Sequence, residues 1–369
     1  MAPVRAVGHI VFVALLLIVT SSQCAAAASL IKLWELDLSR WNKNPGGNAE
    51  KFPVRTLSFS PDGNRIALTG TEIKNDNGQL SGRLLVAQIG ARVEDVESFE
   101  AIRGSDFADW SPSGDAVVVN GLLVRLASRA TCNVPDNSRF ISEDELIGQS
   151  RGPNRSSRFA IYDKNCRSSK TWETPEEWYI TDVSIERHLL LMNKPLQENL
   201  LVDSEGGRVV RRWSMGKWPL WDGPGGNFAD AGAALCGSVG DDFEDVPKGR
   251  DLRCWKTDTG ELIGYAPADR AAAPVSVSRR STRVVFSEYG YIRGVIRDRD
   301  SHPYKDAAVW DYGTGERLAS LIPDTQTWYE LGLHPPKKIV EASKFAISPD
   351  GQYVAEGGNG KLTVYKIQR

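Results

Sequence analysis

The chain has 369 residues, of which 45 are Lys or Arg and 47 are Asp or Glu, so its formal net charge is −2. This near-neutral balance gives no electrostatic reason to expect a nucleic acid or an anionic membrane as partner. Aromatic residues make up 9% of the chain and charged residues 25%, both ordinary for a globular protein, which excludes disorder as the default and predicts a folded globular protein.

The first 28 residues have the three-part pattern of a secretory signal peptide. Arg5 gives a positively charged start, Ile10–Val19 is an unbroken apolar run, and Thr20–Ala28 is small and polar. The apolar run is shorter than the roughly 20 residues that a membrane-spanning helix needs. The segment 1–28 therefore predicts export.

We expect cleavage at the small residues Ala27 or Ala28, which leaves a mature chain of residues 29–369 with no transmembrane span. The mature protein is then secreted or periplasmic. An uncleaved N-terminal anchor is one alternative, and a lipid anchor at Cys24 is another, although Gln23 stands where a lipoprotein signal has a small residue.

A strand–turn–strand phrase recurs along the chain. Proline presets φ, Asp or Ser bonds back to the backbone, and glycine supplies a positive φ, so each phrase predicts a tight turn between two strands. Recurrence of one such unit over a whole chain indicates a repeat architecture. The three copies are Phe59-Ser60-Pro61-Asp62-Gly63, Trp110-Ser111-Pro112-Ser113-Gly114 and Ile347-Ser348-Pro349-Asp350-Gly351.

The remaining sequence consists of short runs rich in Val, Leu, Ile and aromatic residues, broken by Gly, Pro, Asp and Asn. These runs group into seven units in chain order, at about 54–103, 105–135, 138–174, 177–214, 227–266, 272–322 and 342–369.

The last of these units has only three strands, whereas the N-terminal run at 31–38 has no unit of its own. We expect this run to complete the last unit and close the ring, because closure removes an exposed sheet edge. The prediction is an all-β fold, a seven-bladed β-propeller in one domain. Six or eight blades are alternatives, since the third and fifth units are irregular.

Two segments resemble the third strand and following turn of a WD repeat: Ala308–Glu316, which contains Trp310-Asp311, and Cys254–Glu261. The Ser-Pro-Asp-Gly turns resemble the first hairpin of the same repeat. The chain departs from the pattern because its one Gly-His pair, Gly8-His9, lies in the signal. The resemblance is to divergent, exported WD-repeat propellers of bacterial type, and it implies an interaction platform without catalysis.

Four cysteines follow the signal, and an even number in an exported chain predicts two disulfides. Cys236 and Cys254 fall on the second and third strands of the fifth unit, which pair directly. Cys132 and Cys166 follow the third strands of neighbouring units. We therefore expect the disulfides Cys132–Cys166 and Cys236–Cys254, with four buried thiols as the alternative.

The predicted strands place the long connections on one face of the ring and the short turns on the other. Insertions gathered on one face of a repeat fold often mark its binding surface. The long connections are rich in aromatic residues, which suit recognition of a protein or a sugar, unless they fold over the propeller as a lid. The candidate ligand-binding residues are Trp218, Trp221, Tyr291, Tyr304, Trp328 and Tyr329; Trp41, Phe228 and Tyr289 belong to the same aromatic set.

No segment predicts a catalytic centre, a metal site or a cofactor. Gly148–Gly152 matches the G-x-S-x-G pattern of serine hydrolases, but it is expected in a polar loop with no helix after it. His188, His302 and His334 are far apart and lack metal-ligand spacing.

Two functions are open. The first is a non-catalytic exported scaffold that binds a protein or an envelope glycan on its long-connection face. The second is a propeller enzyme, a hydrolase or lyase acting on a sugar or a peptide, with its site at the mouth of the central channel. Converging carboxylates or a histidine would favour the enzyme, whereas an exposed aromatic patch would favour the scaffold.

Overall fold

The fold is built from strands and short 3-10 turns. Among the residues that the structure describes, no α-helix occurs. The structure is a computed structural model, and it describes residues 29–41, 54–74, 80–102, 108–153, 156–194, 198–213, 227–239, 251–266, 272–288, 306–321, 344–358 and 360–368.

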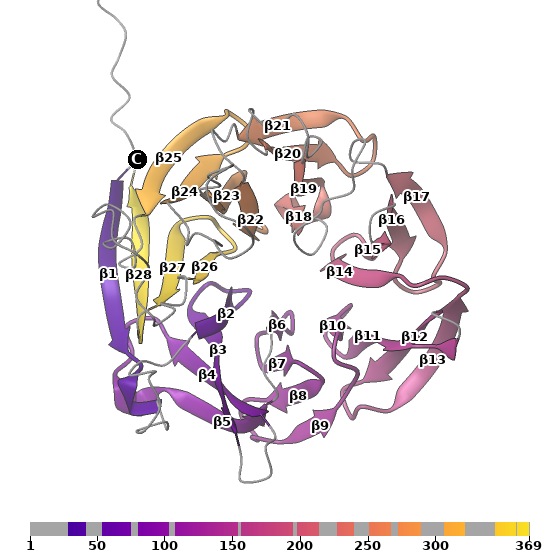
Figure 1. The fold of residues 1–369 in the computed structure, drawn as a ribbon, viewed down its shortest axis with the longest axis horizontal. Helices are drawn as coiled ribbons and strands as arrows, with labels where there is room; N and C mark the ends of the chain where they lie inside the picture. Colours follow the sequence, from indigo (N-terminus) through magenta and orange to yellow (C-terminus); the bar gives the residue numbers. More distant parts are fainter. Residues whose placement is uncertain are drawn as a thin grey trace, which may run out of the picture.

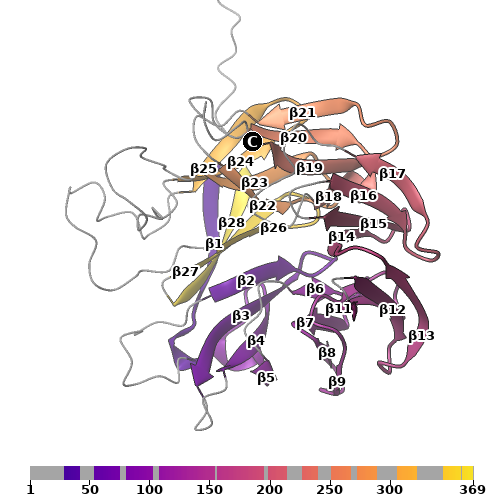
Figure 2. The same cartoon turned by 45° about the vertical axis from the view of Figure 1, so that its right-hand side comes forward.

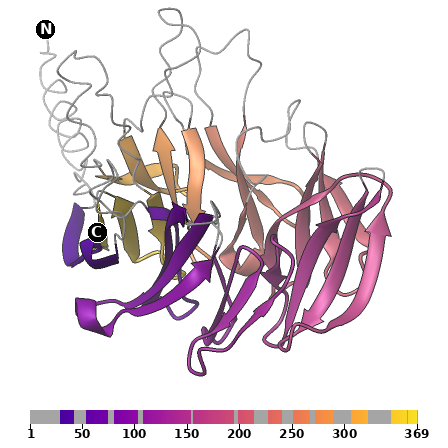
Figure 3. The same cartoon turned by 60° about the horizontal axis from the view of Figure 1, so that its bottom comes forward.

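The strands form seven four-stranded antiparallel sheets, the blades, around one central axis. Figure 1 looks down this axis, with the innermost strand of each blade at the centre and the outermost at the rim. Figures 2 and 3 show the same ring turned toward its side, with the strands crossing its thickness. The predicted seven-bladed β-propeller is confirmed. We name the strands of each blade a to d from the axis outward.

The first four blades follow one another in the chain. Blade 1 contains β2 (Val54–Phe59), β3 (Arg65–Lys74), β4 (Leu80–Gln88) and β5 (Glu97–Ile102); blade 2 contains β6 (Asp109–Trp110), β7 (Ala116–Val119), β8 (Leu122–Arg125) and β9 (Thr131–Asn133). Blade 3 contains β10 (Arg139–Phe140), β11 (Glu145–Arg151), β12 (Ser157–Asp163) and β13 (Ser168–Thr174); blade 4 contains β14 (Tyr179–Ser184), β15 (Leu189–Lys194), β16 (Glu198–Asp203) and β17 (Val209–Trp213).

The last three blades complete the ring. Blade 5 contains β18 (Asn227–Ala229), β19 (Ala234–Val239), β20 (Asp251–Lys256) and β21 (Leu262–Ala266); blade 6 contains β22 (Ala272–Val277), β23 (Arg283–Glu288), β24 (Asp306–Asp311) and β25 (Glu316–Leu321). Blade 7 contains β26 (Lys344–Ile347), β27 (Tyr353–Gly358), β28 (Lys361–Gln368) and β1 (Ser29–Asp37); the 3-10 turns are η1 (Ser39–Trp41), η2 (Val93–Asp95) and η4 (Asp230–Gly232).

Blade 7 joins the two ends of the chain. β1 pairs antiparallel with β28 from Ser29 opposite Gln368 to Asp37 opposite Lys361, and Figures 1 and 2 show the indigo and yellow strands side by side. The side chain of Trp34 also donates from its Nε1 to the carbonyl of Ala91 in blade 1 at 3.1 Å. The predicted closure by the N-terminal strand is confirmed.

The core lies between the faces of neighbouring blades. Side chains alternate across a strand, so successive residues of the c strand β4 enter two different layers. Leu85 packs toward blade 7 with Leu36 and Leu362, whereas Leu84 packs toward blade 2 with Val117. Leu84, Leu85, Val117 and Leu362 are all fully buried. Each blade therefore depends on both of its neighbours to bury its apolar side chains.

The Ser-Pro-Asp-Gly phrases form the turns between strands a and b. In blade 1 the Ser60 hydroxyl accepts a hydrogen bond from the Arg65 N–H at 2.9 Å, and Gly63 has a φ of 75°. In blade 7 Gly351 has a φ of 71°, and a Cβ at this position would lie 2.2 Å from the hydroxyl oxygen of Ser281. Glycine is required here both by the left-handed backbone and by the close approach of blade 6.

The segments that resemble WD repeats occupy the expected strands. Trp310-Asp311 ends β24, the c strand of blade 6, and Trp255 lies near the end of β20, the c strand of blade 5. The Asp311 carboxylate accepts from the Gly313 N–H at 3.0 Å and so shapes the turn that follows. The location of these residues on c strands is as predicted.

The order of strands sorts the connections onto two faces. Strands a to d run alternately up and down through the ring, so every a–b and c–d turn lies at one face and every b–c and d–a connection begins and ends at the other. We call these the short-turn face and the long-connection face. The connections that begin and end at the long-connection face include 42–53, 214–226, 240–250, 289–305 and 322–343.

Hydrogen bonds between neighbouring blades tie the short-turn face together. The Arg65 guanidinium of blade 1 donates to the Gly114 carbonyl of blade 2 at 2.6 Å, and the Arg283 guanidinium of blade 6 donates to the Gly351 carbonyl of blade 7 at 2.7 Å. Both arginines begin strand b, and both acceptors are the glycine of the next a–b turn. The repeated sequence phrase thus also repeats a contact between blades.

Candidate functional site

The six predicted ligand-binding aromatic residues lie outside the residues that the structure describes. Their positions in the chain place them in the connections 214–226, 289–305 and 322–343, which begin and end at the long-connection face. Their role in binding therefore stays a prediction. The residues are Trp218, Trp221, Tyr291, Tyr304, Trp328 and Tyr329.

Two other members of the aromatic set are described, and both are buried. Phe228 lies in β18, the innermost strand of blade 5, and its side chain is fully enclosed among Leu191, Leu235 and other apolar groups. Trp41 lies in η1 and is 7% exposed. The expectation that these rings belong to an exposed aromatic surface is wrong, because Phe228 alternates into the space between blades and Trp41 packs onto the core of blade 1.

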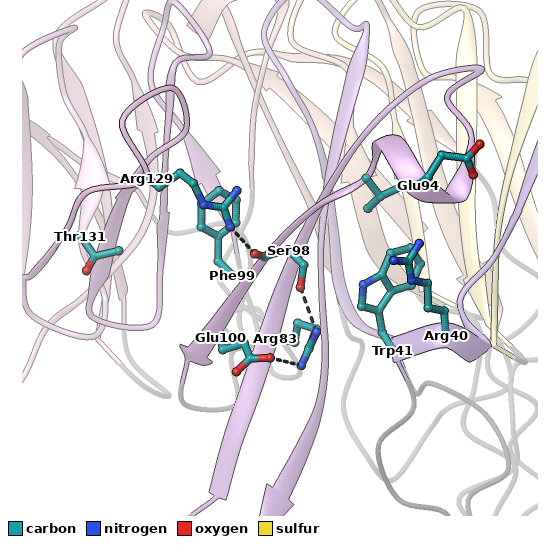
Figure 4. Close-up of a pocket in the computed structure, with 10 residues that line it drawn as sticks. Arg40, Trp41, Arg83, Glu94, Ser98, Phe99, Glu100, Arg129 and Thr131 are labelled. Atoms are coloured by element: carbon teal, nitrogen blue, oxygen red, sulfur yellow. Dashed lines mark hydrogen bonds and ion pairs between the residues drawn. The ribbon is translucent and has the colours of Figure 1, made fainter.

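A groove crosses the outer rim of the ring over the d strand of blade 1, and Figure 4 shows the residues that line it. Its volume is about 610 Å³, within the range of ordinary ligand sites. Arg40 and Trp41 come from the turn after β1, Arg83 comes from β4, and Arg129 comes from the c–d turn of blade 2. We call this the rim groove.

Polar groups of blade 1 hold one wall of the rim groove. Arg83 donates from Nη1 to the Ser98 hydroxyl at 3.0 Å and from Nη2 to the Glu100 carboxylate at 2.6 Å. The Arg83 side chain is 12% exposed and that of Glu100 is 64% exposed. The pair thus has a fixed guanidinium at its base and a carboxylate that faces solvent.

The opposite wall is built on an aromatic ring. The guanidinium of Arg129 lies over the Phe99 ring at 4.5 Å, a cation–π contact, and donates to the Ser98 carbonyl at 2.7 Å. Phe99 itself is buried against blade 2. Sequence reasoning missed this groove, because Arg40, Arg83 and Arg129 come from three blades and no local motif connects them.

A second polar cluster surrounds the axis of the ring. The innermost strand of one blade repeatedly accepts a hydrogen bond from the backbone of the next, which locks neighbouring blades together. The bonds run from Phe140 N to Asp109 Oδ2 (2.9 Å), from Phe228 N to Asp182 Oδ2 (2.7 Å) and from Ile347 N to Ser276 Oγ (3.1 Å).

Burial, more than the neighbouring charges of this axial cluster, shifts the pKa of Asp109. Burial raises the pKa of the Asp109 carboxyl, and the neighbouring carboxylate of Asp182 acts in the same direction. The positive charges of Arg139 and Arg279 and the Phe140 N–H lower this pKa, but burial outweighs them. The cluster therefore holds two carboxylates and two guanidinium groups, and each carboxylate is already a backbone acceptor.

Both predicted disulfides are present. Cys236 and Cys254 stand directly opposite one another on β19 and β20, with Cα atoms 4.1 Å apart. Cys132, on β9 of blade 2, is joined to Cys166 in the c–d turn of blade 3, with Cα atoms 6.2 Å apart. One bond therefore staples a single blade and the other links two blades.

The G-x-S-x-G segment lies on a strand. Gly148 to Arg151 belong to β11, where Ser150 stands opposite Arg158 of β12. The expected polar loop is wrong, because this end of β11 keeps its ladder pairing although its side chains are polar. Within the described part of the chain, no group of three or more His, Cys, Asp or Glu side chains is placed to hold a metal ion.

No protein-family model matches the chain, and no curated protein matches it. In the part of the chain that the structure describes, no helix is both long and apolar enough to span a membrane. The chain is a seven-bladed β-propeller, and its resemblance to WD repeats rests on its own residues.

Proposed function

We propose that this chain is an exported, non-catalytic β-propeller of the WD-repeat type that binds a protein or a cell-envelope component on its long-connection face. The observation that carries this proposal is the difference between the two faces. The short-turn face is closed by hydrogen-bonded turns, whereas the connections 214–226, 289–305 and 322–343 all begin and end at the other face. Connections at this face can be long without disturbing the strands of the ring, and long surface connections often carry binding residues.

Export is supported by the signal-like segment 1–28 and by the two disulfides, Cys132–Cys166 and Cys236–Cys254. Disulfides form and persist in oxidising compartments such as the periplasm and the extracellular space. The WD-repeat type is supported by Trp310-Asp311 at the end of a c strand. The proposal combines these features into a secreted or periplasmic interaction platform.

The axial cluster gives the enzyme alternative no added support. Asp109 and Asp182 lie on the innermost strands, but each accepts a backbone N–H of the following blade. Such carboxylates act as structural acceptors between blades.

The test is affinity capture with the disulfide-bonded mature chain, residues 29–369, from secreted and envelope fractions of the source organism. Proteins and glycans in the eluate are identified, and the affinity of each purified candidate is measured. The Trp218→Ala/Trp221→Ala variant should lose the partner while its melting temperature stays nearly unchanged.

A matched control alters the short-turn face. Asp144 and Lys164 form an exposed ion pair between two turns of blade 3, so Asp144→Ala/Lys164→Ala should keep the partner. Loss of the partner in this control but not in the tryptophan variant would place the binding site on the short-turn face and contradict the proposal. An eluate with no partner would contradict the platform and call for a substrate screen.

A further inference from the structure

The rim groove follows a free strand edge. β5 is the outermost strand of blade 1, so among the described strands the backbone groups on one of its edges have no neighbour. Ser98 lies on this edge, since its carbonyl points outward to the Arg129 guanidinium. An unpaired edge is a template on which another extended segment can add by main-chain hydrogen bonds.

The groove has walls on both faces of β5. On one face of β5, the side chains of Ser98 and Glu100 contact Arg83. On the other face, the Phe99 ring lies under Arg129. Figure 4 shows the two groups on either side of the strand, with Arg40 and Trp41 beyond Arg83. A compact ion would contact one wall only. An extended peptide contacts both, because its side chains alternate between the two faces of the sheet.

The charges of the groove favour an acidic occupant. Of its three arginines, Arg83 is paired with Glu100, and Glu94 lies 3.9 Å from Arg92 at the margin. Within the described residues, Arg40 and Arg129 have no ion pair with a carboxylate. The two walls therefore each offer one guanidinium, which suits carboxylates in bidentate geometry.

We propose that the rim groove binds an extended acidic peptide segment, which adds to β5 as a fifth strand of blade 1. Carboxylates at adjacent positions of the segment then face Arg40 on one side and Arg129 on the other. A peptide N–H then replaces the Arg129 guanidinium as the donor to the Ser98 carbonyl. The guanidinium donates instead to a carboxylate of the segment and stays over the Phe99 ring. The groove lies on the outer rim and meets the long-connection face only at the turn with Arg40 and Trp41, and this proposal does not depend on the partner proposed for that face.

The test uses a fluorescent, end-capped peptide in which Thr-Thr and Asp-Asp pairs alternate, about eight residues long to match a typical strand, so that each Asp-Asp pair presents one carboxylate to either face. Its binding to the mature chain is followed by fluorescence anisotropy at low ionic strength. Three further probes define the chemistry: the same peptide with Lys in place of Asp, the acidic peptide with N-methylated backbone amides, and glutarate as a free dicarboxylate. We expect the acidic peptide alone to bind well.

Two double variants locate the site. Arg40→Ala/Arg129→Ala should weaken binding by about tenfold or more, the usual scale for losing charge-assisted contacts. Arg167→Ala/Arg208→Ala removes the same charge from exposed turns outside the groove and should change the affinity much less. Equal melting temperatures confirm that both variants fold.

Amide hydrogen exchange reports strand addition directly. The acidic peptide should slow exchange within Glu97–Ile102 of β5, and the N-methylated peptide should not. Equal binding of the methylated peptide, or competition by glutarate at similar concentration, would overturn strand addition in favour of a simple anion site. Absence of binding, or equal affinity in the two double variants, would overturn the proposal altogether.

Discussion

Arg279 and Asp182 form an ion pair that reaches past a whole blade. Arg279 lies on the a–b turn of blade 6, and its Nη2 donates to Asp182 Oδ1 on the innermost strand of blade 4 at 2.8 Å. The other carboxylate oxygen accepts the Phe228 N–H of blade 5 at 2.7 Å. One carboxylate therefore gathers three consecutive blades at the axis.

Replacing Arg279 by Ala should destabilise the ring. The Asp182 side chain is only 6% exposed and would keep a buried charge without its partner, whereas Arg279 is 40% exposed and already partly solvated. We expect a loss of about 1–3 kcal/mol in the free energy of unfolding, below the range for fully buried pairs. Chemical denaturation measures this loss. Arg280→Ala, on the same turn and with an exposed side chain, should change stability little; equal losses in both variants would assign the effect to the turn itself.

Replacing Asp109 by Asn should remove a pH dependence of stability. The folded-state pKa of Asp109 is raised by burial, so its contribution favours folding below the unfolded pKa of about 4 and is lost as the pH rises through the folded value. Relative to the wild type, Asp109→Asn should gain stability across this window and on toward neutral pH. Urea unfolding of both proteins between acid and neutral pH measures the difference.

Asp163 provides a control of opposite sign. Its pKa is lowered by the Arg167 N–H, so its contribution is present above pH about 4 and lost as the pH falls. Asp163→Asn should therefore diverge from the wild type in the reverse direction. Parallel curves for Asp109→Asn and the wild type would show that Asp109 has the same pKa in the folded and unfolded chains.

Deleting Ile31–Trp34 should destabilise the whole ring. The deletion breaks the ladder between β1 and β28 and removes the Trp34 bond to Ala91, so it exposes the core between blades 7 and 1. Calorimetry should show a single transition at a much lower temperature. The variant Ile31→Thr/Leu33→Thr changes only side chains that are 40% and 47% exposed and should melt near the wild type. An unchanged melting curve after the deletion would contradict closure by this strand.

Mild reductant should open Cys132–Cys166 before Cys236–Cys254. Cys236 and Cys254 are fully buried, whereas Cys132 and Cys166 are half-buried and open to an attacking thiolate. Differential alkylation followed by mass spectrometry reports the order. The Cys132→Ser/Cys166→Ser variant should lose about 2–4 kcal/mol, since the bond closes a separation of 34 residues. Faster alkylation of Cys236 and Cys254 would show that blade 5 opens more readily than the contact between blades 2 and 3.

Local turn chemistry explains why the fold is readable from the sequence. Ser60 to Gly63 and Ser348 to Gly351 mark a–b turns through residues whose conformational preferences hold in any context. The run 31–38, which has no unit of its own, and the three strands of the last unit together imply closure of the ring by strand counting. Polar side chains are a less reliable sign of a loop. Ser150 lies within β11, because the ladder pairing continues beyond the buried part of the strand.

The candidate sites were only partly accessible to such reasoning. The disulfides follow from strand order, because Cys236 and Cys254 fall on adjacent strands of one blade. The rim groove does not follow, because the contact between Arg129 and Phe99 depends on how two blades pack at the rim. The burial of Phe228 does not follow from the sequence either, because it depends on packing against the neighbouring blade.

By itself, the sequence determined most of the strands, the a–b turns and the closure between β1 and β28, and it favoured seven blades over six or eight, because these features depend on short-range conformational preference and on the need to pair each edge. Only the tertiary structure decided which distant groups meet, as with Arg279 and Asp182 or Arg40 and Arg129. Charge interactions depend on distance and burial, and both are set by the closed ring rather than by neighbours in the chain.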